Sequence, residues 1–230
     1  MISPILANVY LHYALDLWFE KAVRPRCQGE AYMVRYADDF VCCFQYEHEA
    51  EQFYTALIKR LGKFNLEVAQ DKTRIIAFGR NAASHKLQNG GRKPDTFDFL
   101  GFTHYCSKSR KGWFRVKRKT SRKKLRSSIH RCKIWLKANL NTPTKEVIEK
   151  LYQKLIGYYR YYCITDNSPA AGNFQDKVRR MLFRWFNRRS QRKTFNWEKY
   201  VLFLKKHPMP RPKVYVNIYD IRPELLSYLK

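Results

Sequence analysis

Two adjacent carboxylates, Asp38 and Asp39, are the residues of this sequence best suited to metal chemistry. They lie inside an apolar and aromatic run, YMVRYADDFVCCF, at residues 32–44. Adjacent carboxylates repel each other unless water or a cation stabilises them, and Mg²⁺ prefers oxygen ligands. Two-metal phosphoryl-transfer sites use shared carboxylates to hold the ions roughly 4 Å apart. A solvated acidic turn is the alternative, and the dipeptide taken alone favours that alternative.

The residues around the acidic pair predict a β-hairpin with the pair at its tip. Apolar side chains alternate at period two on both sides of the pair, at Val34, Tyr36, Phe40, Cys42 and Phe44. Asp-Asp is a poor two-residue turn because neither residue accepts a positive φ as Gly does. Something other than turn chemistry therefore favours two carboxylates here.

The elements that must position this hairpin are predicted from spacing. A helix begins at Ser3-Pro4 and runs to about Val23, with an apolar stripe at Leu6, Tyr10, Tyr13 and Leu17. A second helix covers about 47–64, with Ala50, Phe53, Leu57 and Leu61 on one face. Two short extended pieces follow in 66–78, then a loop over 79–95, and a second hairpin with a basic tip from 97–102 and 113–116.

After about residue 118 the pattern is helical and basic. Leu125, Ile129, Cys132 and Leu136 keep helical spacing, and the cations Arg126, His130, Lys133 and Lys137 repeat it one residue later. This pattern predicts a helix with an apolar face beside a cationic face. Further helices are expected near 142–160, with Val147, Leu151, Leu155 and Tyr159 in the core, and at 174–188. The tail is expected to lack strong helical character and to contain a strand, VYVNIY, at 214–219.

The net charge of +27 is divided unevenly along the chain. Residues 1–100 hold 13 basic and 12 acidic residues, and residues 101–230 hold the remaining 33 and 7. Such asymmetry predicts a polyanionic partner for the second segment. Interspersed Trp and Tyr residues favour nucleic acid, since bases stack on aromatic rings. No membrane partner is expected, because residues 1–19 read as a helix and not as a signal peptide.

The six cysteines form no CxxC pair and show no zinc-finger spacing. The expected state is free thiols in a reducing cytosol. The predicted location is therefore the cytoplasm. A bacterial cytoplasm is our expectation, and an organellar location stays open.

Five ordered motifs resemble group II intron-encoded reverse transcriptases and maturases. Tyr36-Ala37-Asp38-Asp39 resembles the Y-x-D-D signature of the palm hairpin. The other four are ISPILANVYLH at 2–12, which resembles the preceding helix, DKT at 71–73, FLGF at 99–102, and GYYRYY at 157–162. The resemblance covers nearly the whole chain. It implies an α+β fold, with a partial reverse-transcriptase palm at 1–118 followed by a basic α-helical thumb and maturase domain at 119–230.

The resemblance also implies roles for single residues. Asp38 is expected to bind Mg²⁺ at the polymerase centre, and Asp39 to be the second carboxylate there. Nucleotide or primer contacts are expected from Tyr36, Ala37, Lys72, Phe99, Leu100 and Gly101. Two alternatives stay open: Lys72 is an exposed loop lysine without such a role, and the residues from Phe99 onward form a plain hydrophobic strand. The residues expected to contact nucleic-acid phosphates are Arg126, Lys133, Lys137, Arg160, Arg179, Arg180, Arg184 and Arg188.

The aromatic residues of the basic region have two readings. Stacking on unpaired bases and packing in a helical core both suit Tyr158, Tyr159, Tyr161, Tyr162, Trp185 and Phe186, and the spacing favours the core.

The family pattern also includes fingers, a Pro-Gln-Gly-Gly stretch and an earlier catalytic aspartate, none of which precedes the hairpin in this sequence. Asp16 is not accepted as a substitute for that aspartate. We therefore expect Met1 to be an internal start, the catalytic site to be incomplete, and RNA binding to exceed polymerisation in this chain.

Three functions compete. The first is RNA-directed DNA synthesis combined with intron splicing, with intron RNA and a DNA primer or target as partners, and with an upstream fingers and palm polypeptide as a further partner. The second is an RNA-binding maturase module without polymerase activity, and the third is a decayed fragment that binds nucleic acid non-specifically. Retron-type and CRISPR-associated reverse transcriptases stay open as relatives.

Overall fold

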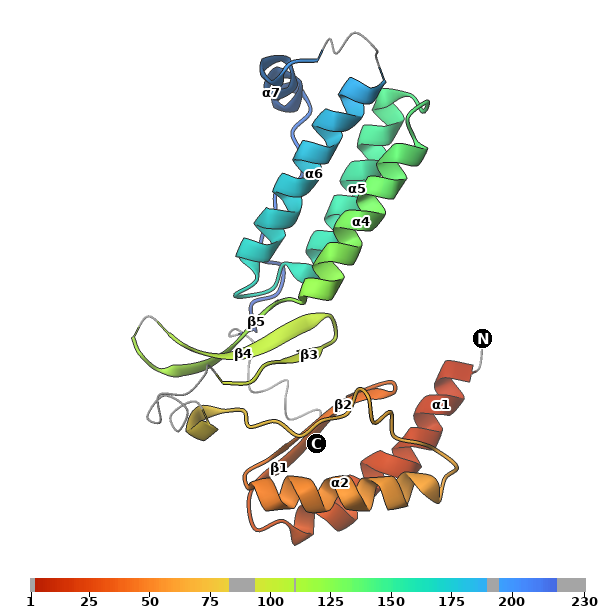
Figure 1. The fold of residues 1–230 in the computed structure, drawn as a ribbon, viewed down its shortest axis with the longest axis vertical. Helices are drawn as coiled ribbons and strands as arrows, with labels where there is room; N and C mark the ends of the chain where they lie inside the picture. The colour runs from red at the N-terminus through yellow and green to blue at the C-terminus, as the bar shows by residue number, and fades with distance from the viewer. Residues whose placement is uncertain (1–2, 83–93, 110, 190–194, 219–230) are drawn as a thin grey trace. The chain divides into compact units, whose positions relative to one another are not determined.

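The computed structural model describes residues 3–82, 94–109, 111–189 and 195–218. It divides into two compact units, Met1–Leu100 and Gly101–Lys230. Helices and antiparallel strands together make the fold α+β, as the sequence predicts (Figure 1). The predicted loop over 79–95 falls mostly outside the described residues.

The first unit opens with a helical segment that changes geometry along its length. Its parts are α1 (Ser3–Leu11), the π-helical turns η1 (His12–Asp16) and η2 (Phe19–Val23), and the 3-10 turn η3 (Arg24–Arg26). The segment therefore passes Pro25 and ends three residues later than the predicted Val23.

The predicted apolar stripe of this helical segment is wrong. Leu6 and Tyr13 are each 60% exposed, whereas Ala14, Leu15 and Phe19 are buried. A π-helical turn inserts an extra residue into the helical repeat, so regular spacing no longer marks one face across it.

The hairpin lies next in the first unit. β1 (Ala31–Tyr36) and β2 (Asp39–Phe44) pair antiparallel, with Ala31 opposite Phe44 and Tyr36 opposite Asp39. The hairpin prediction is confirmed, although the two turn residues are Ala37 and Asp38 and not the acidic pair. The helix α2 (Glu47–Gly62) follows and buries Phe53, Leu57 and Leu61, as predicted. These three residues form one core with Leu15, Phe19 and Ala31.

A buried carboxylate at the start of α2 fixes the chain that enters β1. Glu49 is buried, and its Oε1 accepts hydrogen bonds from the backbone N–H groups of Gln28 (2.6 Å) and Gly29 (3.2 Å). An acidic side chain also suits the positive end of a helix. The contact ties the loop before β1 to α2.

The two short extended pieces predicted in 66–78 are not paired as strands. A turn occupies 70–72, and the backbone N–H groups of Lys72 and Thr73 both donate to the Ala69 carbonyl at 3.0 Å. Local turn hydrogen bonds thus replace a strand ladder here.

The second sheet has the order β3-β4-β5. Its strands are β3 (Phe97–Phe99), β4 (Phe102–Lys108) and β5 (Phe114–Thr120). β4 and β5 form a hairpin, with Phe102 opposite Thr120 and Lys108 opposite Phe114. A second hairpin was predicted from 97–102 and 113–116, but the first of these segments is divided between β3 and the start of β4. Leu100 (φ 49°) and Gly101 (φ 81°) make the tight turn between β3 and β4.

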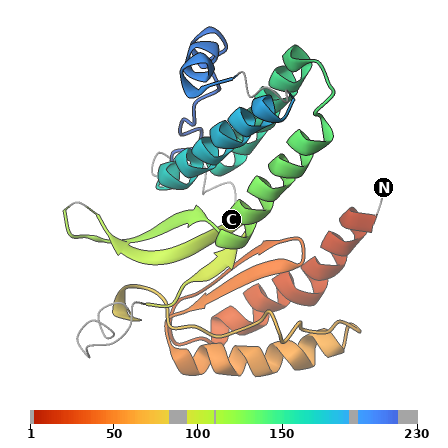
Figure 2. The ribbon, with the colours of Figure 1, turned by 45° about the horizontal axis from the view of Figure 1, so that its top comes forward.

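Helices build the rest of the second unit. They are α4 (Arg122–Ala138), α5 (Thr144–Tyr162), α6 (Ser168–Arg188) and α7 (Trp197–Lys206). α4, α5 and α6 lie side by side (Figures 1 and 2). Their shared core includes the four predicted α5 residues together with Leu136, Val178, Leu182, Trp185 and Tyr200.

Two features of the tail differ from the sequence prediction. α7 was not expected, although Asn196 caps it by accepting a hydrogen bond from the Lys199 N–H at 2.9 Å. The expected strand VYVNIY is reduced to one parallel bridge, Ile164 to Val216, in its described part. Tertiary packing of α7 on α6 outweighs the weak local signal.

A buried polar residue links the sheet to the helices of this unit. The Asn167 side chain is fully buried and bonds the Thr120 N–H (2.7 Å), the Thr120 hydroxyl (2.8 Å) and the Tyr162 carbonyl (2.7 Å). These bonds connect the end of β5 to the end of α5. No helix among the described residues could span a membrane.

Candidate active site and nucleic-acid interface

The acidic pair lies at the tip of the β1–β2 hairpin, in the first unit. Ala37 and Asp38 form the turn, and Asp39 is the first residue of β2. Both aspartates are exposed. Ala37 has a φ of 54°, a left-handed conformation that costs an alanine about 1 kcal/mol. A turn strained in this way needs support from neighbouring groups.

Arg35 provides that support from below the tip. Its guanidinium donates to both carboxylate oxygens of Asp16, from Nε at 2.7 Å and from Nη2 at 2.6 Å. Nη1 donates to the Asn8 side-chain oxygen at 3.0 Å and to the Ala37 carbonyl at 2.9 Å. One side chain therefore joins α1, η1 and the strained turn.

The geometry of this contact makes it a strong one. The Arg35 and Asp16 side chains are 13% and 24% exposed, so water screens the pair only partly. The hydrogen bonds that Arg35 donates to Asp16 raise the pKa of the Arg35 guanidinium above its usual value. Bidentate pairing with a carboxylate also fixes the plane of the guanidinium. The Asp16 carboxylate is thus paired with Arg35.

The two tip carboxylates suit Mg²⁺ in number and type. In enzymes that handle phosphates, Mg²⁺ is usually bound by one or two carboxylates together with water and substrate oxygens. Within the described residues neither Asp38 nor Asp39 takes part in an ion pair. The same part of the chain contains no group of three His, Cys, Asp or Glu side chains that could hold a metal alone. The tip therefore fits a metal that shares its ligands with a bound nucleotide.

The other residues expected near the polymerase centre lie on separate segments. Lys72 is exposed in the turn at 70–72. Phe99 ends β3, and Leu100 and Gly101 form the tight turn that follows. A Cβ at Gly101 would meet the Tyr162 hydroxyl at 3.3 Å, and its φ is also positive. Both features favour glycine at this position.

The second unit carries exposed cations along α4. Arg126, Lys133 and Lys137 are all exposed, while Leu125, Ile129 and Leu136 pack against the helical core. The predicted apolar and cationic faces of this helix are confirmed.

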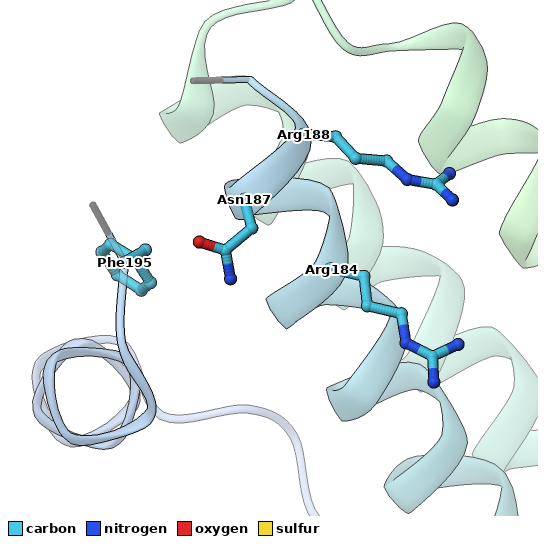
Figure 3. A pocket seen from close by; sticks show the side chains of 4 residues that line it. All are labelled: Arg184, Asn187, Arg188 and Phe195. Atoms are coloured by element: carbon cyan, nitrogen blue, oxygen red, sulfur yellow. The ribbon is translucent and has the colours of Figure 1, made fainter. Parts of the chain in front are cut away.

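A second group of cations lies on α5 and α6. Arg160, Arg180, Arg184 and Arg188 are exposed. Arg184 and Arg188 line a pocket of about 490 Å³ together with Asn187 and Phe195. Their side chains extend to the same side of α6, away from Phe195 (Figure 3).

Arg179 differs from the other arginines of α6. It is half-buried, and its guanidinium lies 5.3 Å from the ring centroid of Trp197. Its carbonyl accepts a hydrogen bond from the Tyr200 hydroxyl at 2.7 Å. Arg179 thus helps to pack α7 on α6.

Two family models match the chain in order along the sequence. Residues 1–104 match reverse transcriptase (RNA-dependent DNA polymerase), and residues 122–203 match the group II intron, maturase-specific domain. The chain belongs to the group II intron reverse transcriptases and maturases. The two matches support the function predicted from the sequence, a reverse transcriptase with a maturase region. A comparison with curated proteins found no match.

The acidic hairpin tip of this group II intron protein lies within the first matched region. The expected phosphate-contacting residues of α4, α5 and α6 all lie within the second. The reverse-transcriptase match implies polymerase chemistry that usually depends on Mg²⁺.

Most aromatic residues of the maturase region pack in the core. Tyr159 and Trp185 are buried, and burial raises the pKa of Tyr158 to about 12, so its hydroxyl stays neutral. Tyr161 differs, since 53% of it is exposed. Core packing is therefore confirmed for Tyr159 and Trp185, whereas Tyr161 stacks on Phe102 with ring centroids 5.9 Å apart.

Arg35 is not among the site residues predicted from the sequence. Its position does carry a signal, because Arg35 shares the inward face of β1 with Ala31 and Met33, where a charged residue needs a partner. Asp16, on a helical segment otherwise rich in apolar residues, is a candidate partner. Connecting them requires knowing that this helical segment crosses the hairpin.

Proposed function

We propose that this chain acts in group II intron mobility and splicing, through two parts with different tasks. Residues 119–230 bind intron RNA. Residues 1–118 contribute the Asp-Asp hairpin of an RNA-directed DNA polymerase centre, which acts on a DNA primer or target. The exposed cations on α4, α5 and α6 are the observation that carries the first part of this proposal.

The charge distribution supports RNA binding on physical grounds. A protein that neutralises phosphates with Lys and Arg releases counterions, which drives association with any nucleic acid. Arg126, Lys133 and Lys137 follow one side of α4, and Arg184 and Arg188 follow one side of α6. Helical rows of this kind can follow a phosphate backbone. Arg160 and Arg180 extend the same interface, while Arg179 acts through packing against Trp197.

A salt titration tests this interface. Replacing Arg126, Lys133 and Lys137 by Gln should make the plot of log RNA association constant against log salt concentration less steep. The slope should fall in magnitude by roughly 2–3, since each duplex phosphate contact contributes about 0.9. The matched control replaces three exposed lysines of the first unit, Lys21, Lys59 and Lys63, by Gln. The control should bind RNA as the unchanged protein does.

A preference for one RNA over another distinguishes a maturase from a non-specific RNA-binding protein. The unchanged protein should prefer its own intron RNA to an unrelated duplex at physiological salt. Equal affinity for both RNAs would contradict the maturase role and leave non-specific binding.

In this proposal the polymerase centre lies at the hairpin tip that Arg35 holds in place. Asp38 and Asp39 would hold Mg²⁺, which supplies charge neutralisation to the phosphates of the incoming nucleotide. Arg35 keeps the strained turn in place through the Ala37 carbonyl. Tyr36 and Ala37 line the approach to the primer end, Lys72 contacts nucleotide phosphates, and the turn from Phe99 to Gly101 supports the primer.

Metal binding can be measured without polymerase activity. Mn²⁺ serves as a paramagnetic probe for Mg²⁺, and NMR line broadening of the 31–44 backbone amides reports its position. Asp38→Asn combined with Asp39→Asn should abolish the broadening, whereas the exposed turn carboxylate Asp71, changed to Asn, is the control. Unchanged broadening in the double variant would remove the pair from the metal site.

A second candidate function is an RNA-binding maturase module without polymerase activity. The exposed cations of α4, α5 and α6 could bind RNA without any contribution from the Asp-Asp tip, which supports this alternative. Primer extension on an RNA template separates the two. Extension that disappears in Asp38→Asn supports the polymerase. RNA binding without any extension, in the presence of an added fingers polypeptide, supports the module.

A further inference from the structure

The β4–β5 hairpin of the second unit carries a side chain that its own fold does not explain. Trp113 is 73% exposed, the largest exposed fraction among the exposed large hydrophobic side chains in the described residues. Water contact with so much apolar surface is unfavourable, and exposed aromatic groups of this kind often mark binding sites.

The turn at this tip does not need an indole. The Ser109 N–H donates to the Trp113 carbonyl at 2.7 Å, and the Trp113 N–H donates to the Ser109 hydroxyl at 3.1 Å. Gly112, with a φ of 82°, supplies the left-handed conformation. Backbone groups and a glycine therefore close the turn, and the ring projects without a structural task.

One face of the same hairpin is cationic. Residues directly opposite in an antiparallel pair share a face, and the register places Lys119 opposite Thr103, Lys117 opposite Tyr105, and Arg115 opposite Ser107. All three β5 side chains on this face are thus basic, and all three β4 side chains carry hydroxyl groups. The Lys119 ammonium lies 5.2 Å from the ring centroid of Tyr105.

The surroundings add further positive charge and leave the hairpin accessible. No Asp or Glu occurs in the sequence between Asp98 and Glu146. Lys108 and Lys111 are exposed beside the turn. In both views the two strands extend away from α4, α5 and α6 (Figures 1 and 2).

We propose that the β4–β5 hairpin is a second RNA contact, in which Trp113 stacks on an unpaired base while Arg115, Lys117 and Lys119 bind the adjoining phosphates. The hairpin lies between the two matched regions apart from its first residues, so neither match assigns it a task. A flat ring beside a row of cations and hydroxyl groups suits a single strand, whose bases are free to stack. The inference rests on the proposed RNA-binding function and names a second place where RNA is bound.

The test compares two kinds of variant on two RNAs by fluorescence anisotropy. Stacking does not involve counterions, so Trp113→Ala should weaken binding of a stem-loop RNA about 10-fold without changing the salt slope. Trp113→Phe should recover most of the affinity, and Trp113→Leu should not. Binding of a fully paired RNA duplex should be the same for all four proteins.

The charge variant gives the complementary result. Changing Arg115, Lys117 and Lys119 to Gln should lower the salt slope for the stem-loop by about 2, since each single-strand phosphate contact contributes about 0.7. The first-unit variant at Lys21, Lys59 and Lys63 is the control for an equal loss of charge. Each side chain changed is at least partly exposed, so circular dichroism should be unchanged.

Each possible outcome decides something specific. Wild-type affinity in Trp113→Ala would overturn the hairpin contact and leave the α4 interface intact. Full recovery by Trp113→Leu would show that the ring meets an apolar partner, such as a protein or a second copy, and would overturn base stacking. Absence of RNA binding by the unchanged protein would overturn the proposed function together with this inference.

Discussion

Replacing Arg35 by Gln removes four hydrogen bonds from beneath the hairpin tip: two to Asp16, one to Asn8 and one to the Ala37 carbonyl. The change leaves the Asp16 carboxylate in a half-buried position without its cation. It also leaves the left-handed turn at Ala37 without its side-chain support. The hairpin should then open more often than the rest of the first unit.

The expected loss of stability follows from how exposed the Arg35 and Asp16 side chains are. Removing one partner of a fully buried ion pair costs about 3–5 kcal/mol, whereas an exposed pair contributes about 0–1 kcal/mol. The two side chains are 13% and 24% exposed, which places this pair between those limits. We expect about 2 kcal/mol of lost local stability for Arg35→Gln or Asp16→Asn. In the double variant the two losses should not add, because the pair is absent after the first change.

Hydrogen–deuterium exchange over residues 31–44 measures this loss locally. A destabilisation of about 2 kcal/mol speeds exchange of the hairpin amides about 30-fold, since each 1.4 kcal/mol is tenfold. The control is Arg26→Gln, which removes an exposed arginine whose Nη1 donates to the Ala22 carbonyl in the same helical segment. That control should leave exchange at 31–44 unchanged.

The double-mutant cycle gives the decisive result. A coupling free energy of about 1 kcal/mol or more between Asp16 and Arg35 is expected. A coupling near zero, with additive single effects, would refute the argument that this pair supports the hairpin. Faster exchange in Arg26→Gln would refute the claim that the effect is local to the tip.

Three further predictions concern stability. Asn167→Ala should destabilise the second unit by about 2–3 kcal/mol in urea denaturation, because buried hydrogen-bonding groups lose their partner, and exposed Asn141→Ala should not. Leu155→Ala, at a buried position of α5, should cost about 2–5 kcal/mol in the same assay, whereas exposed Leu202→Ala should cost far less. Burial raises the pKa of the Cys42 thiol to about 12. The folded state therefore holds this proton more tightly than the unfolded state does, which stabilises the folded protein below pH 9. This contribution is lost as the pH rises toward 12. The fall in melting temperature from pH 8.5 to 10.5 should therefore be smaller in Cys42→Ala than in the unchanged protein, and an equal fall would contradict this.

Helices with one continuous apolar stripe were predictable from the sequence. Phe53, Leu57 and Leu61 in α2 and Leu151, Leu155 and Tyr159 in α5 are buried as their spacing indicates. Regular helix geometry converts spacing into a face, so local pattern is sufficient there. The same reason explains why the cationic face of α4 could be predicted.

The first helical segment could not be read in the same way. Apolar residues occur on several sides of it, and Ile5, Leu6 and Val9 are all exposed. The π-helical turns shift the face that meets the core, and no sequence signal marks them. Spacing therefore selected Leu6 and Tyr13 where packing selects Leu15 and Phe19.

The β1–β2 hairpin shows what an alternating apolar pattern cannot predict by itself. The alternating set Val34, Tyr36, Phe40 and Cys42 suggests one face. With a two-residue turn Tyr36 pairs with Asp39, so Phe40 lies opposite Arg35 and shares its face. Alternation identifies the strands, but the length of the turn decides which residues share a face. Arg35 was overlooked for this reason.

The division of charge between the two units has a consequence for the proposed metal site. Arg35 is the cation nearest in sequence to the aspartates, and it could have neutralised them. Its guanidinium instead bonds Asp16, Asn8 and the Ala37 carbonyl, all of which are distinct from the tip carboxylates. Because Asp16 balances the charge of Arg35, the tip is braced without losing its own negative charge. Two unneutralised carboxylates can then attract a divalent cation, while the surplus cations of the second unit serve the nucleic acid.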